Sequence, residues 1–190
     1  GTALEMQRKL VAARHGGGVG DQLLLLEHLA VITVGVSGRR RRDHVLATPD
    51  ELRDKGIELL DVPRGGDVTF HGPGQLVGYP IIDLKPDRCD VHRYVRDLEE
   101  VLIRTVASFG VVAGRVAGLT GVWVGDDKLA AIGVRLSRWV ASHGFALNVA
   151  PDLDQFRLIV PCGLRGRGVT SIERLIGSVP PRPDLEAVVA

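Results

Sequence analysis

Residues 75–110, QLVGYPIIDLKPDRCDVHRYVRDLEEVLIRTVASFG, decide the fold of this chain. The apolar run from Gln75 to Leu84 predicts a strand. After Asp90, apolar side chains recur at helical spacing until Gly110, which predicts a helix capped by Asp90 and ended by Gly110. The residues expected on its core-facing side are Val91, Val95, Leu98, Val101, Leu102, Val106 and Phe109. A strand followed by a long amphipathic helix indicates an α/β fold.

The remaining elements extend this pattern in both directions. Thr2 with Glu5, and Thr48 with Glu51, have the spacing of capping boxes and predict helices that end near the glycines at 16–18 and at Gly56. Strands are expected at 23–27, 30–36, 57–62, 111–116, 121–124, 129–136 and 145–149, and short helices at 153–158, 171–175 and from 183 onward. The fold class is therefore α/β of the α+β type, a single domain with a mixed sheet flanked by helices.

Composition excludes several classes of protein. A chain of 190 residues suits one domain, and 24 basic against 23 acidic residues argue against a polybasic nucleic-acid binder. Apolar runs are too short to cross a bilayer, and the amino end lacks the order of a signal peptide, so a cytoplasmic protein is expected. Two cysteines in unlike contexts, Cys89 and Cys162, favour reduced thiols.

A glycine-rich stretch with a central histidine runs from Arg64 to Gln75. Positions without a Cβ allow backbone N–H groups to approach a ligand closely, as an anion nest or the floor of a cleft. The alternative is an ordinary glycine-rich loop between two strands.

Two further positions are candidates for chemistry. Cys162 lies between Pro161 and Gly163, in a bend that would expose a nucleophilic sulfur next to backbone N–H groups, although a buried structural cysteine fits as well. Lys128 opens a predicted strand, where a solvated lysine is the ordinary outcome. The small residues that follow, at 131–133, would let a ligand lie close to that strand.

Taken together, these segments resemble the octanoyltransferases of lipoate biosynthesis. The matching pieces, in order, are Leu26-Glu27-His28, Arg64-Gly65-Gly66 through Thr69 to His71-Gly72-Pro73-Gly74-Gln75, Gly78-Tyr79-Pro80-Ile81, Lys128 with Ala131-Ile132-Gly133, His143-Gly144-Phe145-Ala146-Leu147-Asn148, and Pro161-Cys162-Gly163. Leu29 stands where the family commonly has proline. The expectation is one catalytic domain over residues 1–190, truncated at its termini.

The resemblance implies transfer of an octanoyl or lipoyl group from an acyl carrier protein thioester to a lysine ε-amine of a lipoyl domain. It implies Cys162 as nucleophile and Lys128 as its partner in a Cys/Lys dyad, on a fold similar to biotin and lipoate protein ligases. The implied substrate-binding residues are Arg64, Gly65, Gly66, Asp67, Val68, Thr69, Phe70, His71, Ala131, Ile132, Gly133, Gly144, Phe145 and Ala146, with His143 and Gly163 in support.

The same resemblance names the partners. The implied acceptors are lipoyl domains of 2-oxoacid dehydrogenase complexes and the glycine cleavage H protein, and the implied donor is acyl carrier protein. No cofactor, metal, nucleic acid or membrane is expected to take part.

The chemistry explains why such residues are needed. An acceptor lysine of pKa about 10.4 is protonated at neutral pH, and removing its proton costs about 4 kcal/mol. We expect Lys128 to act first as acid toward the departing carrier thiol and then as base toward the attacking amine. An eight-carbon chain can contribute about 5 kcal/mol of binding in an apolar slot, so selectivity for length is expected to be graded.

Three other functions remain open at this stage. An ATP-dependent lipoate or biotin ligase would need no cysteine, and a thiol hydrolase would pair Cys162 with His71 or His143. The third is a binding module without catalysis. The run Arg39 to Arg42 is either a solvated loop or a patch that steers acidic partners.

Overall fold

The computed structural model describes residues 2–40, 42–160 and 167–190. The helices are α1 (Thr2–His15), α2 (Pro49–Asp54), α3 (Val91–Ala107), α4 (Ile172–Ile176) and α5 (Arg182–Val189), with 3-10 turns η1 (Gly38–Arg40), η2 (Arg42–His44) and η3 (Leu153–Leu158). The strands are β1 (Gln22–Leu26), β2 (Val31–Val34), β3 (Glu58–Asp61), β4 (Val68–His71), β5 (Gln75–Ile81), β6 (Val122–Val124), β7 (Asp127–Ser137) and β8 (Val140–Asn148). The α/β fold class is confirmed.

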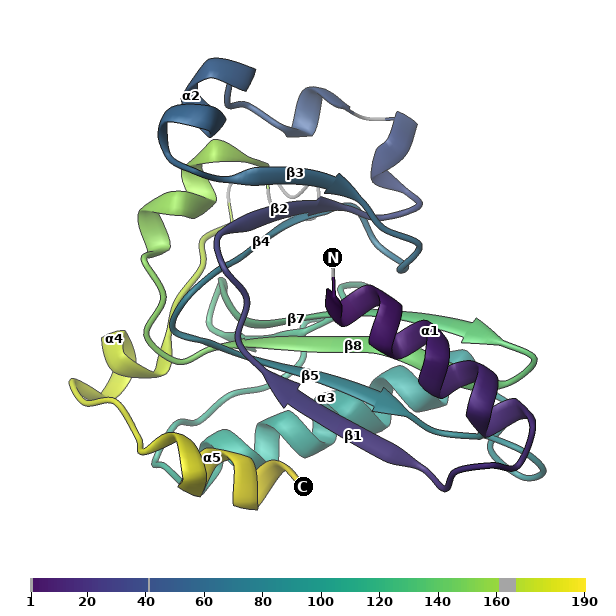
Figure 1. Cartoon of the computed structure of the whole chain (residues 1–190). Helices are drawn as coiled ribbons and strands as arrows, with labels where there is room; N and C mark the ends of the chain where they lie inside the picture. Colours follow the sequence, from purple (N-terminus) through teal and green to yellow (C-terminus); the bar gives the residue numbers. More distant parts are fainter. Residues whose placement is uncertain (1, 41, 161–166) are drawn as a thin grey trace.

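The strands form two sheets that face each other (Figure 1). The larger sheet has the order β1-β5-β8-β7-β6 and is antiparallel throughout. The smaller one has the order β3-β2-β4, in which β2 runs parallel to β3 and antiparallel to β4. The strands expected at 23–27 and 30–36 therefore contribute to different sheets, not to one mixed sheet.

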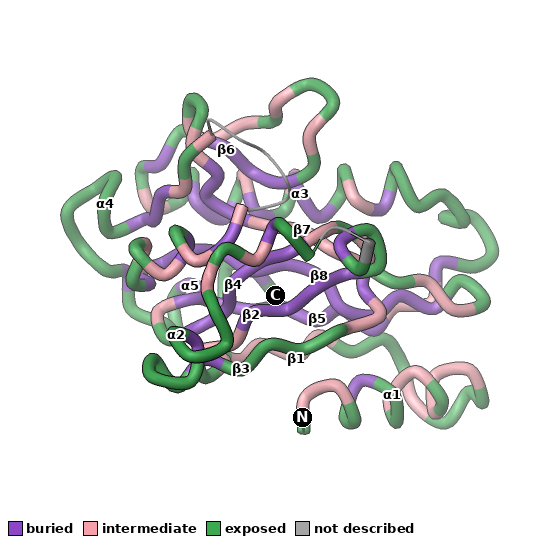
Figure 2. Tube along the Cα trace, turned by 90° about the horizontal axis from the view of Figure 1, so that it is seen from above, coloured by how far each residue is buried: buried purple, intermediate pink, exposed green. Residues whose placement is uncertain are grey.

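Helices cover the outer face of each sheet, and the core divides accordingly. Figure 1 shows α3 and α5 beneath the larger sheet and α2 above the smaller one. Leu102, Val106, Leu129 and Leu147 belong to the buried cluster under the larger sheet. In Figure 2 strands β4, β5 and β8 are buried along their length, whereas β3, the outer turns and most of α1 are not.

Helix α3 confirms the sequence prediction at its start and corrects it along its face. The Asp90 side chain accepts hydrogen bonds from the backbone N–H groups of His92 and Arg93, as an N-cap residue does. The buried face is rotated from the predicted one, because Val91 and Val101 are 38% and 39% exposed. The buried positions are Tyr94, Leu98, Glu99, Leu102, Thr105 and Val106.

Three other sequence predictions change. Residues 111–116 form no named strand and make only a bridge between Gly114 and Trp123. The glycine-rich stretch contains a strand, β4, rather than loop alone. Strand β8 begins at Val140 instead of 145, after a turn in which Arg138 and Trp139 both have positive φ. Within the described residues, each helix is too short or too polar to span a membrane.

Candidate active site

A pocket of about 1030 Å³ lies between the two sheets. Strands β7 and β8 supply its floor, and β2 and β4 supply residues on the opposite side, including Thr33 and Thr69. Helix α1 and strand β1 complete the wall with aliphatic side chains such as Leu24 and Leu26. The pocket is thus long, largely apolar and built from regular elements.

Small residues form the floor of the pocket and leave space above it. Ala131 pairs with Ala146 across β7 and β8, and Gly133 pairs with Gly144 two residues farther along. All four line the pocket. The expectation that a ligand could lie close to this strand therefore agrees with the observed geometry.

The two floor glycines are also required by the protein itself. A Cβ on Gly144 would lie 2.3 Å from the carbonyl oxygen of Gly78, and a Cβ on Gly133 would lie 2.8 Å from that of Gly65. Gly65 in turn donates its N–H to the Val134 carbonyl at 2.9 Å. These contacts hold the glycine-rich stretch against β7.

The structure brings most of the expected substrate-binding residues together in this pocket. Those that line it are Arg64, Gly66, Asp67, Val68, Thr69, His71, Ala131, Ile132, Gly133, Gly144, Phe145 and Ala146, together with His143. Gly65 and Phe70 are not among the lining residues. Phe70 packs instead in the cluster below α2, edge-on to Phe156 with ring centroids 5.5 Å apart.

Arg64 places a fixed positive charge in the pocket wall. Its side chain is 9% exposed. Nη2 donates to the Thr33 carbonyl and hydroxyl at 2.8 and 2.9 Å, and Nη1 donates to the Gly65 carbonyl at 3.0 Å. These contacts hold the guanidinium in one orientation before any ligand arrives.

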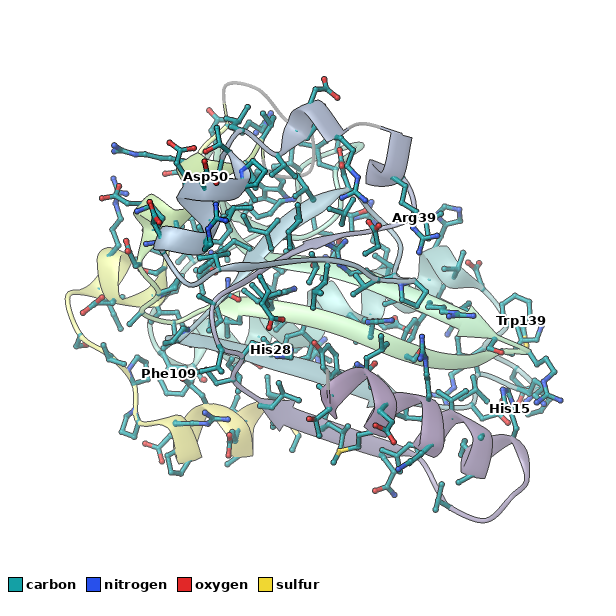
Figure 3. All side chains as sticks on the ribbon, turned by 45° about the horizontal axis from the view of Figure 1, so that its top comes forward. His15, His28, Arg39, Asp50, Phe109 and Trp139 are labelled. Atoms are coloured by element: carbon teal, nitrogen blue, oxygen red, sulfur yellow. The ribbon has the colours of Figure 1, made fainter. Side chains whose placement is uncertain are left out.

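A cluster of neutral polar rings lies beside this charge. His28, on the connection from β1 to β2 (Figure 3), and the Tyr79 hydroxyl are joined by a 2.6 Å hydrogen bond. The rings of His28 and His71 are 5.7 Å apart, and those of Tyr79 and His143 are 6.1 Å apart. All four residues line the pocket.

Burial fixes the charge state of these rings. It lowers the pKa of His71 to about 3 and that of His143 to about 4, with the Arg64 charge as the second cause in each case. Burial also lowers the pKa of His28 and raises that of Tyr79 to about 12. At neutral pH the cluster offers hydrogen bonds but no charge.

His143 has an unusual backbone for a strand residue. Its φ is 56°, and its N–H donates to the side-chain oxygen of Gln7 at 2.7 Å. Gln7 is the buried residue of α1. Positive φ at a histidine is a strained conformation that the surroundings must maintain, and such strain is common at functional sites.

Lys128 lies beside the pocket, in a smaller cavity that adjoins it. This second cavity, of about 10 Å³, is lined by Lys128, Gln75 and Asn148, and it shares Thr69, Ala131 and Ala146 with the large pocket. The expectation of a solvated strand end is wrong, because Lys128 is only 6% exposed. Its Nζ is 4.7 Å from the centre of the Trp123 ring.

The backbone of Lys128 is tied to the chain that follows the candidate nucleophile. Lys128 N–H donates to the Gly168 carbonyl at 3.0 Å, and Thr170 N–H donates to the Lys128 carbonyl at 3.1 Å. Cys162 and Gly163 lie outside the described residues. Cys89 is an exposed free thiol near the start of α3.

The arginine run lies near the end of the smaller sheet that is farther from α2. Figure 3 shows Arg39 at the periphery, and its side chain is exposed. Arg42 forms a 2.6 Å ion pair with Asp61 of β3. Arg41 lies outside the described residues, as does the side chain of Arg40.

Sequence reasoning assigned no role to His28, Tyr79, Thr33 or Gln7. His28 and Tyr79 lie within the motifs that carry the family resemblance, so the sequence did contain a signal for these two residues. Thr33 and Gln7 carried none, because their roles depend on partners 31 and 136 residues away. Only the fold reveals such contacts.

The arrangement suits a long apolar ligand with a reactive end. The small residues of its floor leave space for a chain, its wall provides one cation and neutral hydrogen-bonding groups, and the adjoining cavity contains a buried amine. Pockets with a mostly apolar lining and a few convergent polar groups are typical of small-molecule sites.

Comparison with known proteins agrees with this description. The family described as lipoyl protein ligase A/B catalytic domain matches residues 1–190. The octanoyltransferase of Solibacter usitatus is 56% identical over 174 residues, covering 92% of this chain and 78% of that protein. The octanoyltransferase of Chloroflexus aggregans is 52% identical over 186 residues, covering 96% and 83%.

Solved structures show the same fold. The bipartite lipoate protein ligase from Thermoplasma acidophilum superimposes with a TM-score of 0.69 at 17% identity, covering 98% of this chain and 77% of that one. The biotin protein ligase from Aquifex aeolicus gives a TM-score of 0.53 at 14% identity, covering 84% and 66%. The fold, the pocket and the identity to curated relatives together show that this chain belongs to the lipoyl protein ligase A/B catalytic domain family, as an acyltransferase of its octanoyltransferase group.

Proposed function

We propose that this enzyme takes an octanoyl group from the thioester of acyl carrier protein and transfers it to a lysine ε-amine of a lipoyl domain, through a thioester on Cys162. The observation that carries the proposal is the buried amine of Lys128 in a cavity that adjoins a pocket floored by small residues. Octanoyl transfer in protein lipoylation is what the curated relatives' name describes.

The floor of Ala131, Gly133, Gly144 and Ala146 accommodates the acyl chain in this proposal. About seven buried carbons contribute about 5 kcal/mol at ~0.8 kcal/mol each. This is enough to keep the acyl chain in its groove between the two half-reactions. The pocket volume of about 1030 Å³ exceeds that of the acyl chain, so space remains for the arm of a carrier or an acceptor lysine.

The first half-reaction forms one bond and breaks one. The Cys162 thiolate attacks the thioester carbon, a new carbon–sulfur bond forms, and the bond to the carrier sulfur breaks. Lys128, as ammonium, gives its proton to that departing sulfur. The products are acyl-Cys162, the free carrier thiol and a neutral Lys128 amine.

The second half-reaction returns Lys128 to its starting state. The neutral amine takes a proton from the acceptor ammonium, which makes the acceptor nucleophilic. The acceptor nitrogen then attacks the acyl carbon, the carbon–sulfur bond breaks, and the proton released from that nitrogen goes to the Cys162 sulfur. The Cys162 thiol loses this proton to solvent, which regenerates the thiolate and accounts for the one proton that the overall reaction releases. Removal of the acceptor proton is the costly step, at about 4 kcal/mol in water at neutral pH.

The chain connectivity supports pairing Lys128 with Cys162. Gly168, whose carbonyl accepts the Lys128 N–H at 3.0 Å, is six residues after Cys162 in the sequence. A cysteine between proline and glycine is a reasonable nucleophile, because neighbouring backbone N–H groups can stabilise the oxyanion. The carriers of the acceptor lysine are proposed to be lipoyl domains of 2-oxoacid dehydrogenases and the glycine cleavage H protein.

The histidines argue against the thiol hydrolase alternative. A Cys–His pair functions as thiolate and imidazolium, and the pKa values of His71 and His143, about 3 and about 4, keep both rings neutral. The ligase alternative shares the fold, and the biochemical experiment separates it from the transferase.

Intact mass spectrometry tests the proposal. The enzyme is mixed with octanoyl-acyl carrier protein without ATP, and an added octanoyl mass on Cys162 that moves to a lipoyl domain is the expected result. Cys162→Ser is expected to abolish the adduct, and Lys128→Arg to block release from a preformed acyl-enzyme. Transfer that requires ATP, or that persists in Cys162→Ser, would overturn the proposal.

A further inference from the structure

We propose that Trp123 is a positioning residue whose ring holds the side chain of Lys128 beside the acyl pocket. The inference rests on the role given to Lys128 under the proposed function. It assigns a role to a residue that is absent from the expected site residues and from the pocket lining.

The geometry is that of a cation on an aromatic face. Lys128 Nζ is 4.7 Å from the Trp123 ring centre, and the guanidinium carbon of Arg167 is 5.4 Å from the same centre. Both distances fall within the roughly 6 Å over which a ring attracts a cation, and indole is the strongest of the aromatic side chains in this respect. Trp123 thus lies against one cation from β7 and another from the chain after Cys162.

Trp123 is buried, but its ring lies against cations and not within an apolar cluster. It is 2% exposed and belongs to none of the four apolar clusters among the described residues, although its neighbour Val122 does. Its Nε1 is buried without a hydrogen-bond partner in the described part of the chain. A tryptophan in such surroundings contributes through its ring face.

The backbone around Trp123 is fixed from two directions. Trp123 exchanges hydrogen bonds with Gly114 at 2.8 and 2.9 Å, and it pairs with Lys128 across β6 and β7 next to a register shift. Gly121 donates its N–H to the fully buried carboxylate of Glu99 at 3.0 Å, and its missing Cβ would lie 3.5 Å from Lys128 Cε. The ring and the lysine stem are therefore held in one relative position.

The contact with the Trp123 ring matters because the lysine side chain is flexible. Its four-carbon stem loses rotamer freedom when it is ordered, and an acid or base must lie within hydrogen-bonding reach of the proton it transfers. A ring that attracts the ammonium orients Lys128 in the step in which it donates a proton. The neutral amine left afterwards is then already in place for the acceptor.

Two substitutions separate the effect of the aromatic face of Trp123 from the effect of its side-chain volume. Trp123→Phe keeps an aromatic face, whereas Trp123→Met keeps apolar volume without one. We expect transfer from a preformed acyl-enzyme to fall about 10- to 30-fold in Trp123→Met and by no more than about threefold in Trp123→Phe. Circular dichroism and thermal melts confirm folding, and Trp139→Phe, at an exposed tryptophan, is the matched control.

A second readout follows Lys128 without using the reaction. Trace acetylation with acetic anhydride, read as the labelled fraction of the Lys128 peptide, reports the exposure and orientation of the amine. We expect labelling to rise about tenfold in Trp123→Met and to remain near the wild-type value in Trp123→Phe. Equal labelling or equal transfer in the two variants would overturn the proposal.

The Lys128→Arg variant distinguishes failure of the proposed role of Lys128 from failure of the proposed role of Trp123. If it retains transfer, the proposed role of Lys128 is wrong, whatever the labelling shows. If it loses transfer while Trp123→Met keeps full transfer, the catalytic role of Lys128 stands and the positioning role of Trp123 is refuted.

Discussion

Acidification from pH 7 to pH 5 is expected to weaken this fold through its buried histidines. The pKa of His71 is about 3 and that of His143 about 4 in the folded protein, against about 6.5 in an unfolded chain. Because each pKa is lower when folded, the unfolded chain takes up protons first. Stability therefore falls as the pH drops below about 6.5, and the loss continues until the folded values are reached.

The size of the effect follows from those values. At pH 5 an unfolded histidine is almost fully protonated while His71 and His143 remain neutral, and linkage gives a loss of about 2 kcal/mol for each between pH 7 and pH 5. Together they remove about 4 kcal/mol, a large part of the roughly 5–15 kcal/mol typical of a domain. Carboxylates contribute little in this range, because their ordinary pKa values lie near 4.

Urea unfolding at pH 7 and pH 5 measures the loss. His71→Gln and His143→Asn remove the titrating rings, and asparagine suits the positive φ of His143. Each variant is expected to reduce the pH-dependent loss by about half. If the free energy of unfolding of the wild type changes by less than about 1 kcal/mol over this range, the histidines are not buried and neutral as described.

The other predictions concern the pocket and its rim. Ala146→Leu adds three carbons to the floor and should lower kcat/KM for octanoyl carrier about 30-fold while sparing pentanoyl carrier; an unchanged ratio between the two donors would remove Ala146 from the acyl path. Gly144→Ala forces a Cβ toward the Gly78 carbonyl, so thermal melts should show a loss of about 1–3 kcal/mol, and an unaltered Tm would contradict the packing. Arg39→Gln should lower kcat/KM about two- to threefold at low salt and flatten its salt dependence, compared with Arg53→Gln on α2; matching behaviour of the two variants would leave the arginine run as a solvated loop.

Local signals in the sequence were sufficient for most helices. The capping box at Thr48 and Glu51 and the Asp90 cap appear in the structure with the expected hydrogen bonds. These contacts join residues two or three positions apart, so a linear sequence contains them. The exposed Val91 and Val101 show where apolar spacing alone fails to predict the buried face of a helix. The observed face includes Glu99, which is buried because its carboxylate forms an ion pair.

Strands were harder because their limits are set by distant partners. The start of β8 was missed because Arg138-Trp139 carries none of the usual turn residues and His143-Gly144 resembles a turn. Strand β4 was missed because the glycines around it obscured the alternation. The buried position of Lys128 was equally invisible, since it depends on Trp123 and on the chain at 168–170.

The floor of the acyl pocket has a consequence for how substrate range can evolve. At Ala131, Gly133, Gly144 and Ala146 the side chains are already a methyl group or nothing. Almost every substitution there enlarges a residue, and only alanine to glycine at position 131 or 146 removes a methyl group. Single mutations on the floor can therefore shorten the accepted chain substantially but can deepen the groove by at most one methyl group at a position, so chain-length preference is easier to narrow than to widen there.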